Sequence, residues 1–309
     1  MAKDIPPRRK VVGAVKGGIV QIKNKFNLPG PVVEAVSQVR KPKGDSISVT
    51  ALIDSPRIRS LTTKHWDSLE EDASSRLWAL LGQGLHGVLA EYAVNKEVFA
   101  EEGIKATVSG TVISGRPDFY CDGNVIDYKI TSVYSFLLGI KESWTRQCNV
   151  YGHLFRSAGF PVRSLSVHAI LRDWVESKTY QDPDYPEIPF LTAPIDLWSP
   201  GDCEQYIKDQ VRRHLDFPMD PCTDAEKWAR SPAFAVSKVG GKRALRVLDT
   251  LREANQWGEK YHAEKPGVKL EIRERAGEFV RCNRYCLVRG VCDLNVYNNP
   301  TAEKGWEEL

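Results

Sequence analysis

The stretch that decides the fold is GRPDFYCDGNVIDYKI, residues 115–130. It reads as two short strands joined by a tight turn, because its Asp-Gly-Asn centre (122–124) supplies the positive φ that a hairpin loop needs. Strand side chains alternate between faces, so Asp127 and Lys129 share one face, and Asp118 on the first strand lies within reach of Asp127. Two carboxylates and a lysine are costly to bury on an apolar hairpin, and a divalent cation is one purpose that fits.

Composition narrows the class of protein. The chain has 309 residues, of which 42% are hydrophobic and 27% charged, ample for a sizeable core. No apolar run reaches the roughly 18 residues of a membrane span, and the charged N-terminus has no apolar signal core. We therefore expect a soluble, cytoplasmic protein without a membrane partner. Seven cysteines, concentrated late in the chain, favour metal ligation over disulfides in a reducing compartment.

Charge is unevenly placed. Residues 1–44 hold ten Lys or Arg and two acids, a net +8, so the other 265 residues sum to −5 against a total of +3. A basic arm on a mildly acidic body suits a polyanionic partner, but a solubilising tail would read the same way.

Hydrophobic periodicity predicts alternating helices and strands. Residues 48–58 read as a short strand or entry segment. The further expected elements are a helix over 67–92 that Gly82 and Gly84 interrupt, a strand over 105–114, the hairpin, a helix over 143–158, a strand over 165–171, a helix over 199–215, a strand over 234–238, a helix from 240 and a strand over 268–272. This order predicts an α/β core with a mixed central sheet flanked by helices.

The same pattern suggests three regions. Residues 1–46 are expected to form a mostly irregular basic arm, 47–220 the core, and 221–309 a basic region with a C-terminal cysteine-ligated metal module packed on that core.

The carboxylates of the hairpin suit a hard cation. Mg²⁺ and Mn²⁺ prefer oxygen ligands, which Asp118, Asp127 and a strand carbonyl next to Lys129 can supply. Such an ion can polarise a phosphate and activate water. Lys129 beside it can orient that water or neutralise charge in the transition state.

Two further motifs extend this interpretation. Pro117-Asp118 followed by Asp127-Tyr128-Lys129 resembles the signature of the PD-(D/E)XK nucleases. Gly82-Gln83-Gly84-Leu85-His86 resembles the GxxxH motif before the core in the RecB-like branch, and Gln147-Cys148-Asn149-Val150-Tyr151 resembles the QxxxY motif after it. Gln147 and Tyr151 are one helical turn apart, so both can face one site. The resemblance implies a restriction-endonuclease-like core.

The resemblance also implies roles for individual residues. His86, Asp118 and Asp127 would be ligands of Mg²⁺ or Mn²⁺, with the carbonyl of Ile130 a further candidate. Glu91, on the helix that carries His86, is an alternative ligand.

Three residues of the resembling motifs would serve the chemistry without binding metal. Lys129 would be the catalytic lysine. Gln147 and Tyr151 would be accessory groups that position DNA or that lysine.

A second cluster closes the chain. Cys282, Cys286 and Cys292 have C-x3-C-x5-C spacing, and structural zinc and iron–sulfur sites both want four ligands. The remaining candidates for the fourth thiolate are Cys121, Cys148, Cys203 and Cys222.

This tail resembles RecB-like nucleases such as the AddB subunit and the CRISPR adaptation exonucleases, which implies a [4Fe–4S] cluster; Zn²⁺ is the alternative. In those families the first cysteine precedes the core, whereas no cysteine here precedes Cys121. We favour Cys222, in a turn-like setting after the core, as the fourth ligand, with Cys203 next.

Function follows as an expectation. The resemblance, together with LIDSPRI (52–58) and RCNRYC (281–286), implies a metal-dependent DNA exonuclease of the bacteriophage type, active in recombination or replication. The substrate would be single- or double-stranded DNA ends. Alternatives are a flap or branch endonuclease, or a non-catalytic DNA-binding protein with a structural metal cluster. A homo-oligomer or a recombination partner protein is possible. Candidate DNA contacts are Lys238, Lys242, Arg243, Arg246, Arg281, Arg284, Arg289, Trp228, Trp257 and Tyr285.

Overall fold

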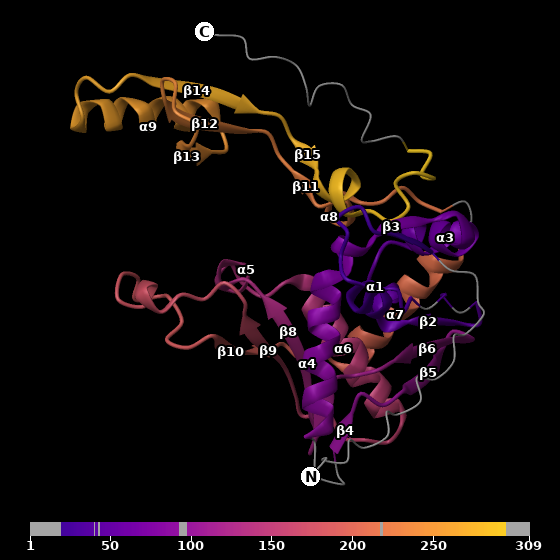
Figure 1. Ribbon diagram of the computed structural model, residues 1–309. Helices are drawn as coiled ribbons and strands as arrows, with labels where there is room; N and C mark the ends of the chain where they lie inside the picture. Colours follow the sequence, from indigo (N-terminus) through magenta and orange to yellow (C-terminus); the bar gives the residue numbers. More distant parts are fainter. Residues whose placement is uncertain (1–19, 40, 43, 93–97, 217–218, 295–309) are drawn as a thin grey trace, which may run out of the picture.

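A twisted five-stranded sheet forms the centre of the computed structural model, which describes residues 20–39, 41–42, 44–92, 98–216 and 219–294 (Figure 1). Its strand order is β10-β9-β8-β7-β4. The strands are β4 (Val98–Ala100), β7 (Phe119–Cys121), β8 (Asn124–Thr131), β9 (Ser164–Leu171) and β10 (Phe190–Ile195). Only the β8–β9 pair in this sheet is parallel, so the sheet is mixed, as predicted.

The predicted hairpin is β7 and β8. Asp122 and Gly123 take φ values of 43° and 80°, the left-handed conformations of a two-residue hairpin turn. Helix α6 (Glu142–Ser157) then carries the chain from β8 to β9, as a parallel pair requires, and packs on both strands. Helix α4 (Leu77–Glu91) packs alongside β8.

A smaller sheet lies beside the central one and completes the core. Its order is β2 (Ser46–Ser48), β6 (Thr111–Gly115) and β5 (Ile104–Val108). Buried side chains from this sheet meet α6 and helix α7 (Pro200–Leu215) in one cluster that includes Ile47, Ile113, Leu154, Phe155 and Ile207. The ring of Phe155 stacks on Tyr120 of the hairpin at 4.2 Å, so the hairpin is anchored directly in this core.

The N-terminal part of the chain adds four short elements. They are β1 (Gln21–Lys23), α1 (Gly30–Val36), α2 (Val49–Leu52) and β3 (Glu70–Asp72). Helix α5 (Val133–Leu137) follows the hairpin. In the described part of the chain no helix combines the length and the apolarity needed to cross a bilayer.

Two sequence predictions about the first half of the chain were wrong, and the arm predicted to be mostly irregular holds two short elements. Residues 48–58 are mostly helical instead of forming a strand. Ser48 caps α2, Ser55 caps α3 (Pro56–His65), and Pro56 is the first residue of α3. The strand expected over 105–114 is two strands, β5 and β6. The stretch expected to be irregular contains β1, paired with β3, and α1; its residues 1–19, 40 and 43 lie outside the described residues.

The helix expected from Asp67 begins at Leu77 instead. Trp66 and Leu69 are buried against Val20 and Val288 in a separate cluster, so the chain before the helix is held in another direction. Helix α4 then runs unbroken past both glycines to Glu91. A helical glycine lowers stability but does not by itself end a helix.

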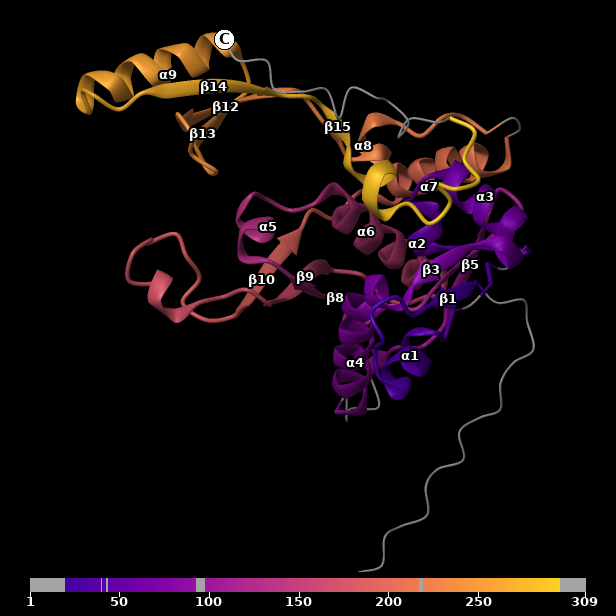
Figure 2. The ribbon, with the colours of Figure 1, turned by 45° about the horizontal axis from the view of Figure 1, so that its top comes forward.

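The C-terminal region forms an arm that projects from the body (Figures 1 and 2). A narrow ribbon of β11 (Ala229–Arg230) and β15 (Glu278–Phe279) follows the short helix α8 (Asp224–Lys227). Beyond it, helix α9 (Leu251–Glu264) packs on a sheet whose strand order is β13 (Ala244–Leu248), β12 (Ala233–Lys238) and β14 (Leu270–Arg275). After β15, residues 281–285 make one π-helical turn.

The helix predicted from residue 240 was wrong. Residues 244–248 form strand β13, and α9 starts only at Leu251, where Thr250 and Glu253 make a capping box. The spacing of Ala244, Val247 and Leu248 fits a helix or a strand, and pairing with β12 decides for the strand.

One ion pair ties the body to the C-terminal turn. Arg281 donates to both oxygens of Asp54 at 2.6 Å, and to the carbonyl of Glu226. Burial by itself would raise the pKa of Asp54, but the hydrogen bonds and charge of Arg281 outweigh it and hold that pKa below its ordinary value. The pair therefore joins segments 227 residues apart in sequence.

We expect Arg281→Gln to lower the free energy of unfolding by about 2 kcal/mol, because it leaves Asp54 partly buried without its partner. Chemical denaturation of Arg281→Gln, Asp54→Asn and the double variant forms a cycle whose coupling energy measures the pair. Since the folded-state pKa of Asp54 is depressed, this stabilisation is present above the pKa of the unfolded state and is lost as pH falls through the folded-state value. A coupling of zero at neutral pH would contradict the assignment.

Candidate metal site

Strand pairing lines up three carboxylates across the central sheet. Phe119 on β7 pairs with Ile126 on β8 and with Ala100 on β4. The neighbouring residues on the same side of these pairs are acidic. Asp118 comes just before β7, Asp127 follows Ile126 on β8, and Glu101 comes just after β4. The backbone N–H of Glu101 donates to the carbonyls of residues 117 and 118 at 3.2 and 3.3 Å, which fixes it beside Asp118.

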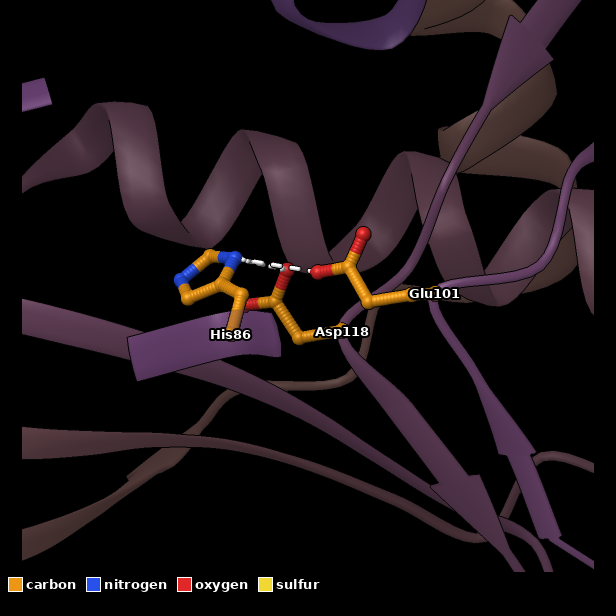
Figure 3. A group of neighbouring side chains, drawn as sticks. All are labelled: His86, Glu101 and Asp118. Carbon is orange, nitrogen blue, oxygen red and sulfur yellow. Dashed lines mark hydrogen bonds and ion pairs between the residues drawn. The ribbon is translucent and has the colours of Figure 1, made fainter. Parts of the chain in front are cut away.

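Helix α4 adds a histidine to this row. His86 Nδ1 lies 3.0 Å from Glu101 Oε1 and 3.2 Å from Asp118 Oδ1, and its Nε2 lies 3.3 Å from the carbonyl of Tyr128. Figure 3 shows the three side chains pointing at one another. Within the described residues, this is the one group of three or more His, Cys, Asp or Glu whose ligand atoms all lie within 4.8 Å of one another.

The second half of the site is a chain of contacts from β8 to α6. Lys129 Nζ lies 2.6 Å from Asp127 Oδ2 and donates to Gln147 Oε1 at 3.0 Å. Gln147 Nε2 in turn donates to the hydroxyl of Tyr151 at 3.3 Å. The amide of Gln147 thus sets the position of the lysine, and Tyr151 sets the position of the amide.

Burial raises the pKa values of the carboxylates Asp118 and Asp127. Burial, together with the charge of Asp127, raises the pKa of Asp118 to about 7, although His86 and Lys129 oppose the rise. Burial also raises the pKa of Asp127, against the pull of Lys129. Two carboxylates in one dry site repel each other, and nearby positive charge lowers both pKa values.

The donor set fits a divalent cation. Asp127 is 1% exposed, yet neither of its oxygens has a well-aligned hydrogen bond to a described residue; the close approach of Lys129 is an ion pair. A buried carboxylate oxygen without a donor is costly unless something else satisfies it. Asp118 Oδ2 is occupied by the N–H of Tyr128 at 2.7 Å, which leaves Oδ1 toward His86 and Glu101.

The remaining predicted ligands are placed as follows. Ile130 follows Lys129 on β8 and pairs with Ile170, and its carbonyl stays a predicted ligand. Glu91 is exposed at the last turn of α4 and is not in the His86 group. Glu101 is the acidic residue that the sequence analysis missed.

Four cysteines, Cys222, Cys282, Cys286 and Cys292, line one small cavity together with residues of α3 and α8. Figure 2 shows the C-terminal turn in yellow beside α8. The four sulfurs are more widely spaced than the ligand atoms around His86, since no three of them meet the same 4.8 Å limit in the described part of the chain. Burial raises the pKa of Cys282 and Cys286, and neighbouring thiols raise both further.

The other three cysteines lie elsewhere. Cys203 is fully buried on α7 and donates to the carbonyl of Asn149 at 3.3 Å, and burial raises its pKa to about 12. Cys148 is fully buried on α6, and Cys121 ends strand β7. None of these three lines the cavity of the other four.

Comparisons with known proteins give distant structural likenesses. No protein-family model and no curated protein sequence matches the chain. SSO0001 is 20% identical, with a TM-score of 0.42, and the likeness covers 64% of this chain and 87% of SSO0001. The alkaline exonuclease LHK-Exo of Laribacter hongkongensis is 11% identical, with a TM-score of 0.35, covering 55% and 88%.

The predicted DNA contacts fall in two places. Lys238, Lys242, Arg243 and Arg246 lie on strands β12 and β13 or their connecting turn, in the arm. Arg281 and Arg289 line the cysteine cavity instead. Trp228 and Tyr285 lie against each other beside that cavity, with ring centroids 5.6 Å apart.

Gln147 offers a test of how the lysine is positioned. We expect Gln147→Ala to lower kcat about tenfold, because one hydrogen bond to a charged group is worth about 1.5 kcal/mol. KM should change little, since Gln147 contacts Lys129 rather than solvent. Steady-state hydrolysis of a short DNA measures both constants. Tyr151→Phe is the matched variant and should lose less. An unchanged kcat in Gln147→Ala would contradict this role.

Proposed function

We propose that the chain is a DNA nuclease dependent on a divalent metal, with the site at the β7–β8 hairpin. The observation that supports it best is Asp127, a buried carboxylate whose Oδ2 pairs with Lys129 while its Oδ1 has no donor among the described residues, next to a lysine held by Gln147. Carboxylates, a histidine and a lysine in one site are the groups that phosphodiester hydrolysis needs.

The residues divide the work. Asp127, Asp118, His86 and Glu101 would hold Mg²⁺ or Mn²⁺, with the Ile130 carbonyl as a further ligand. When bound, such an ion polarises the phosphate and acidifies water. Lys129, fixed between Asp127 and Gln147, keeps a positive charge beside the scissile phosphate and stabilises charge that develops there.

We propose that the enzyme works from DNA ends, as an exonuclease. The alternative is cleavage within a strand at flaps or branches. Incubation with Mn²⁺ of linear DNA, and of a circular duplex of the same sequence that carries a flap, separates the two. Loss of the linear substrate alone supports the exonuclease, and cleavage of the circle at its flap supports the endonuclease. If neither substrate is cut with Mn²⁺ or Mg²⁺, the proposed function is wrong.

We also propose that the four cysteines hold a [4Fe–4S] cluster. Zinc, which four thiolates also bind, is the alternative. The cluster would fix the C-terminal turn on α3 and α8, and takes no part in hydrolysis. The discriminating measurement is the iron, sulfide and zinc content of protein purified without oxygen.

A further inference from the structure

A groove lined by hydroxyl, cationic and apolar side chains reaches Gly115 and Arg116, just before the β7–β8 hairpin. Its volume is about 800 Å³, and its walls come from the β2–α2 segment, α3, β5 and β6. Hydroxyl side chains line it at Ser46, Ser48, Thr50, Ser55, Thr62 and Ser114, and cationic side chains at Lys41, Arg59, Lys105 and Arg116. Hydroxyls and cations are the groups that bind sugar–phosphate backbones without reading sequence.

Arg59 is the most informative of these cations. It lies on α3, half-buried, and its guanidinium has no hydrogen bond or ion pair with any residue that the structure describes. Burial lowers its pKa. A half-buried cation without a partner is costly, and a phosphate in the groove would satisfy it.

The groove reaches the catalytic residues through one wall. Tyr151 lines it and also receives the hydrogen bond of Gln147, which holds Lys129. Gly115 lines the same wall, and a Cβ at this position would approach the Tyr151 ring to 2.7 Å. Arg116, two residues before Asp118, is exposed at the groove.

The opposite wall is shared with the cysteine cavity. Ile58 of α3 lines both hollows. Ser55 lines the groove, and its hydroxyl lies 3.1 Å from the sulfur of Cys222. Two carboxylates, Asp45 and Asp54, also line the groove, where free carboxylates would repel phosphate, and Arg281 covers both oxygens of Asp54.

We infer that this groove carries the backbone of one DNA strand to the metal site, and that Arg281 of the cysteine module keeps it receptive by neutralising Asp54. This inference rests on the proposed nuclease function. We take the occupant to be a single strand, because the groove has a volume of about 800 Å³ and is lined by hydroxyl and cationic side chains that suit one sugar–phosphate backbone. Duplex ends would have to fray before a strand enters.

Binding of a short fluorescent oligothymidylate, measured by anisotropy without Mg²⁺ or Mn²⁺, tests the inference. Arg59→Gln with Arg116→Gln should weaken binding about tenfold. It should also flatten the slope of log affinity against log salt by about 0.7 for each phosphate that the variant no longer neutralises. Arg212→Gln on α7, whose side chain pairs with Asp209 outside the groove, is the control and should bind as the unaltered chain does.

Single and double variants of Arg281 and Asp54 test the role of Arg281. Arg281→Gln should weaken binding, and adding Asp54→Asn should restore it to within about twofold. A double variant as weak as Arg281→Gln would overturn the neutralising role. If Arg281→Gln does not fold, Asp54→Asn alone decides, since removing a paired carboxylate should leave binding unchanged and a large loss would contradict the inference.

The outcomes separate this inference from the proposed function. A chain that binds the oligonucleotide through Arg59 and Arg116 but never cuts DNA refutes the nuclease and keeps the groove. A chain that cuts DNA while Arg59→Gln/Arg116→Gln binds and cuts normally refutes the groove. Lys105→Gln with Arg116→Gln, both exposed, repeats the test where Arg59 substitution disturbs folding.

Discussion

Asp127→Asn is expected to lower DNA hydrolysis at least about a thousandfold, because a carboxylate that holds the metal accounts for several kcal/mol of transition-state stabilisation. Asn keeps the shape of Asp but lacks the charge that attracts a cation. Since Asp127 is 1% exposed and lies beneath Lys129, its loss should leave DNA affinity within about twofold. Single-turnover cleavage and anisotropy, measured on the same preparation, report both quantities.

The matched control is Asp122→Asn at the tip of the same hairpin. Asp122 is exposed, and its carboxylate pairs with Arg163 just before β9, so the variant should cleave at the unaltered rate. Equal activity of Asp127→Asn and Asp122→Asn would show that Asp127 on the hairpin has no catalytic role.

Cys286→Ser should have the largest effect on stability. Losing one of the four proposed ligands should release the proposed cluster, and we expect the free energy of unfolding to fall by more than about 4 kcal/mol. The cavity residues lie on α3, α8 and the C-terminal turn, so these segments should separate. Iron content, chemical denaturation and limited proteolysis within 219–294 report the loss. Cys121→Ser, whose thiol is outside the cavity, is the control.

The contact between Ser55 and Cys222 allows a rescue. Cys222→Ser should lose the metal, and Ser55→Cys in the same chain should recover part of it, because the two atoms lie 3.1 Å apart. Full metal content in Cys222→Ser would show that Cys222 is not a ligand. Cys203 could not replace it without leaving the core, where it is fully buried.

Much of the site could be predicted because its residues are close in sequence. Asp118, Asp127 and Lys129 belong to one hairpin, and its Asp-Gly turn could be predicted from the sequence. Gln147 and Tyr151 share a helix face, so their joint position followed from helical spacing.

Glu101 could not be predicted in the same way. It meets Asp118 because β4 pairs with β7, a contact between strands separated by the whole β5–β6 hairpin. A positive φ of 54° at Glu101 also breaks the alternation that would have marked it. A pair of glutamates ahead of Gly103 was the one local signal.

The errors in the fold have similar causes. Ser55 followed by Pro56 was a sound helix start, and interpreting the proline as a strand break missed it. Trp66 and Leu69 fit the helical pattern of α4, yet they pack with Val288 from the other end of the chain. Such long-range packing leaves no local trace.

In the proposed mechanism the β7–β8 hairpin binds the metal ion that DNA hydrolysis requires. Titration of Mn²⁺ into metal-depleted protein tests this, with bound Mn²⁺ and the cleavage rate of end-labelled linear DNA followed in the same samples. We predict that occupancy and rate rise together and saturate together, and that both are lost in Asp127→Asn. Full Mn²⁺ occupancy without cleavage, or unaltered cleavage in Asp127→Asn, would contradict the mechanism.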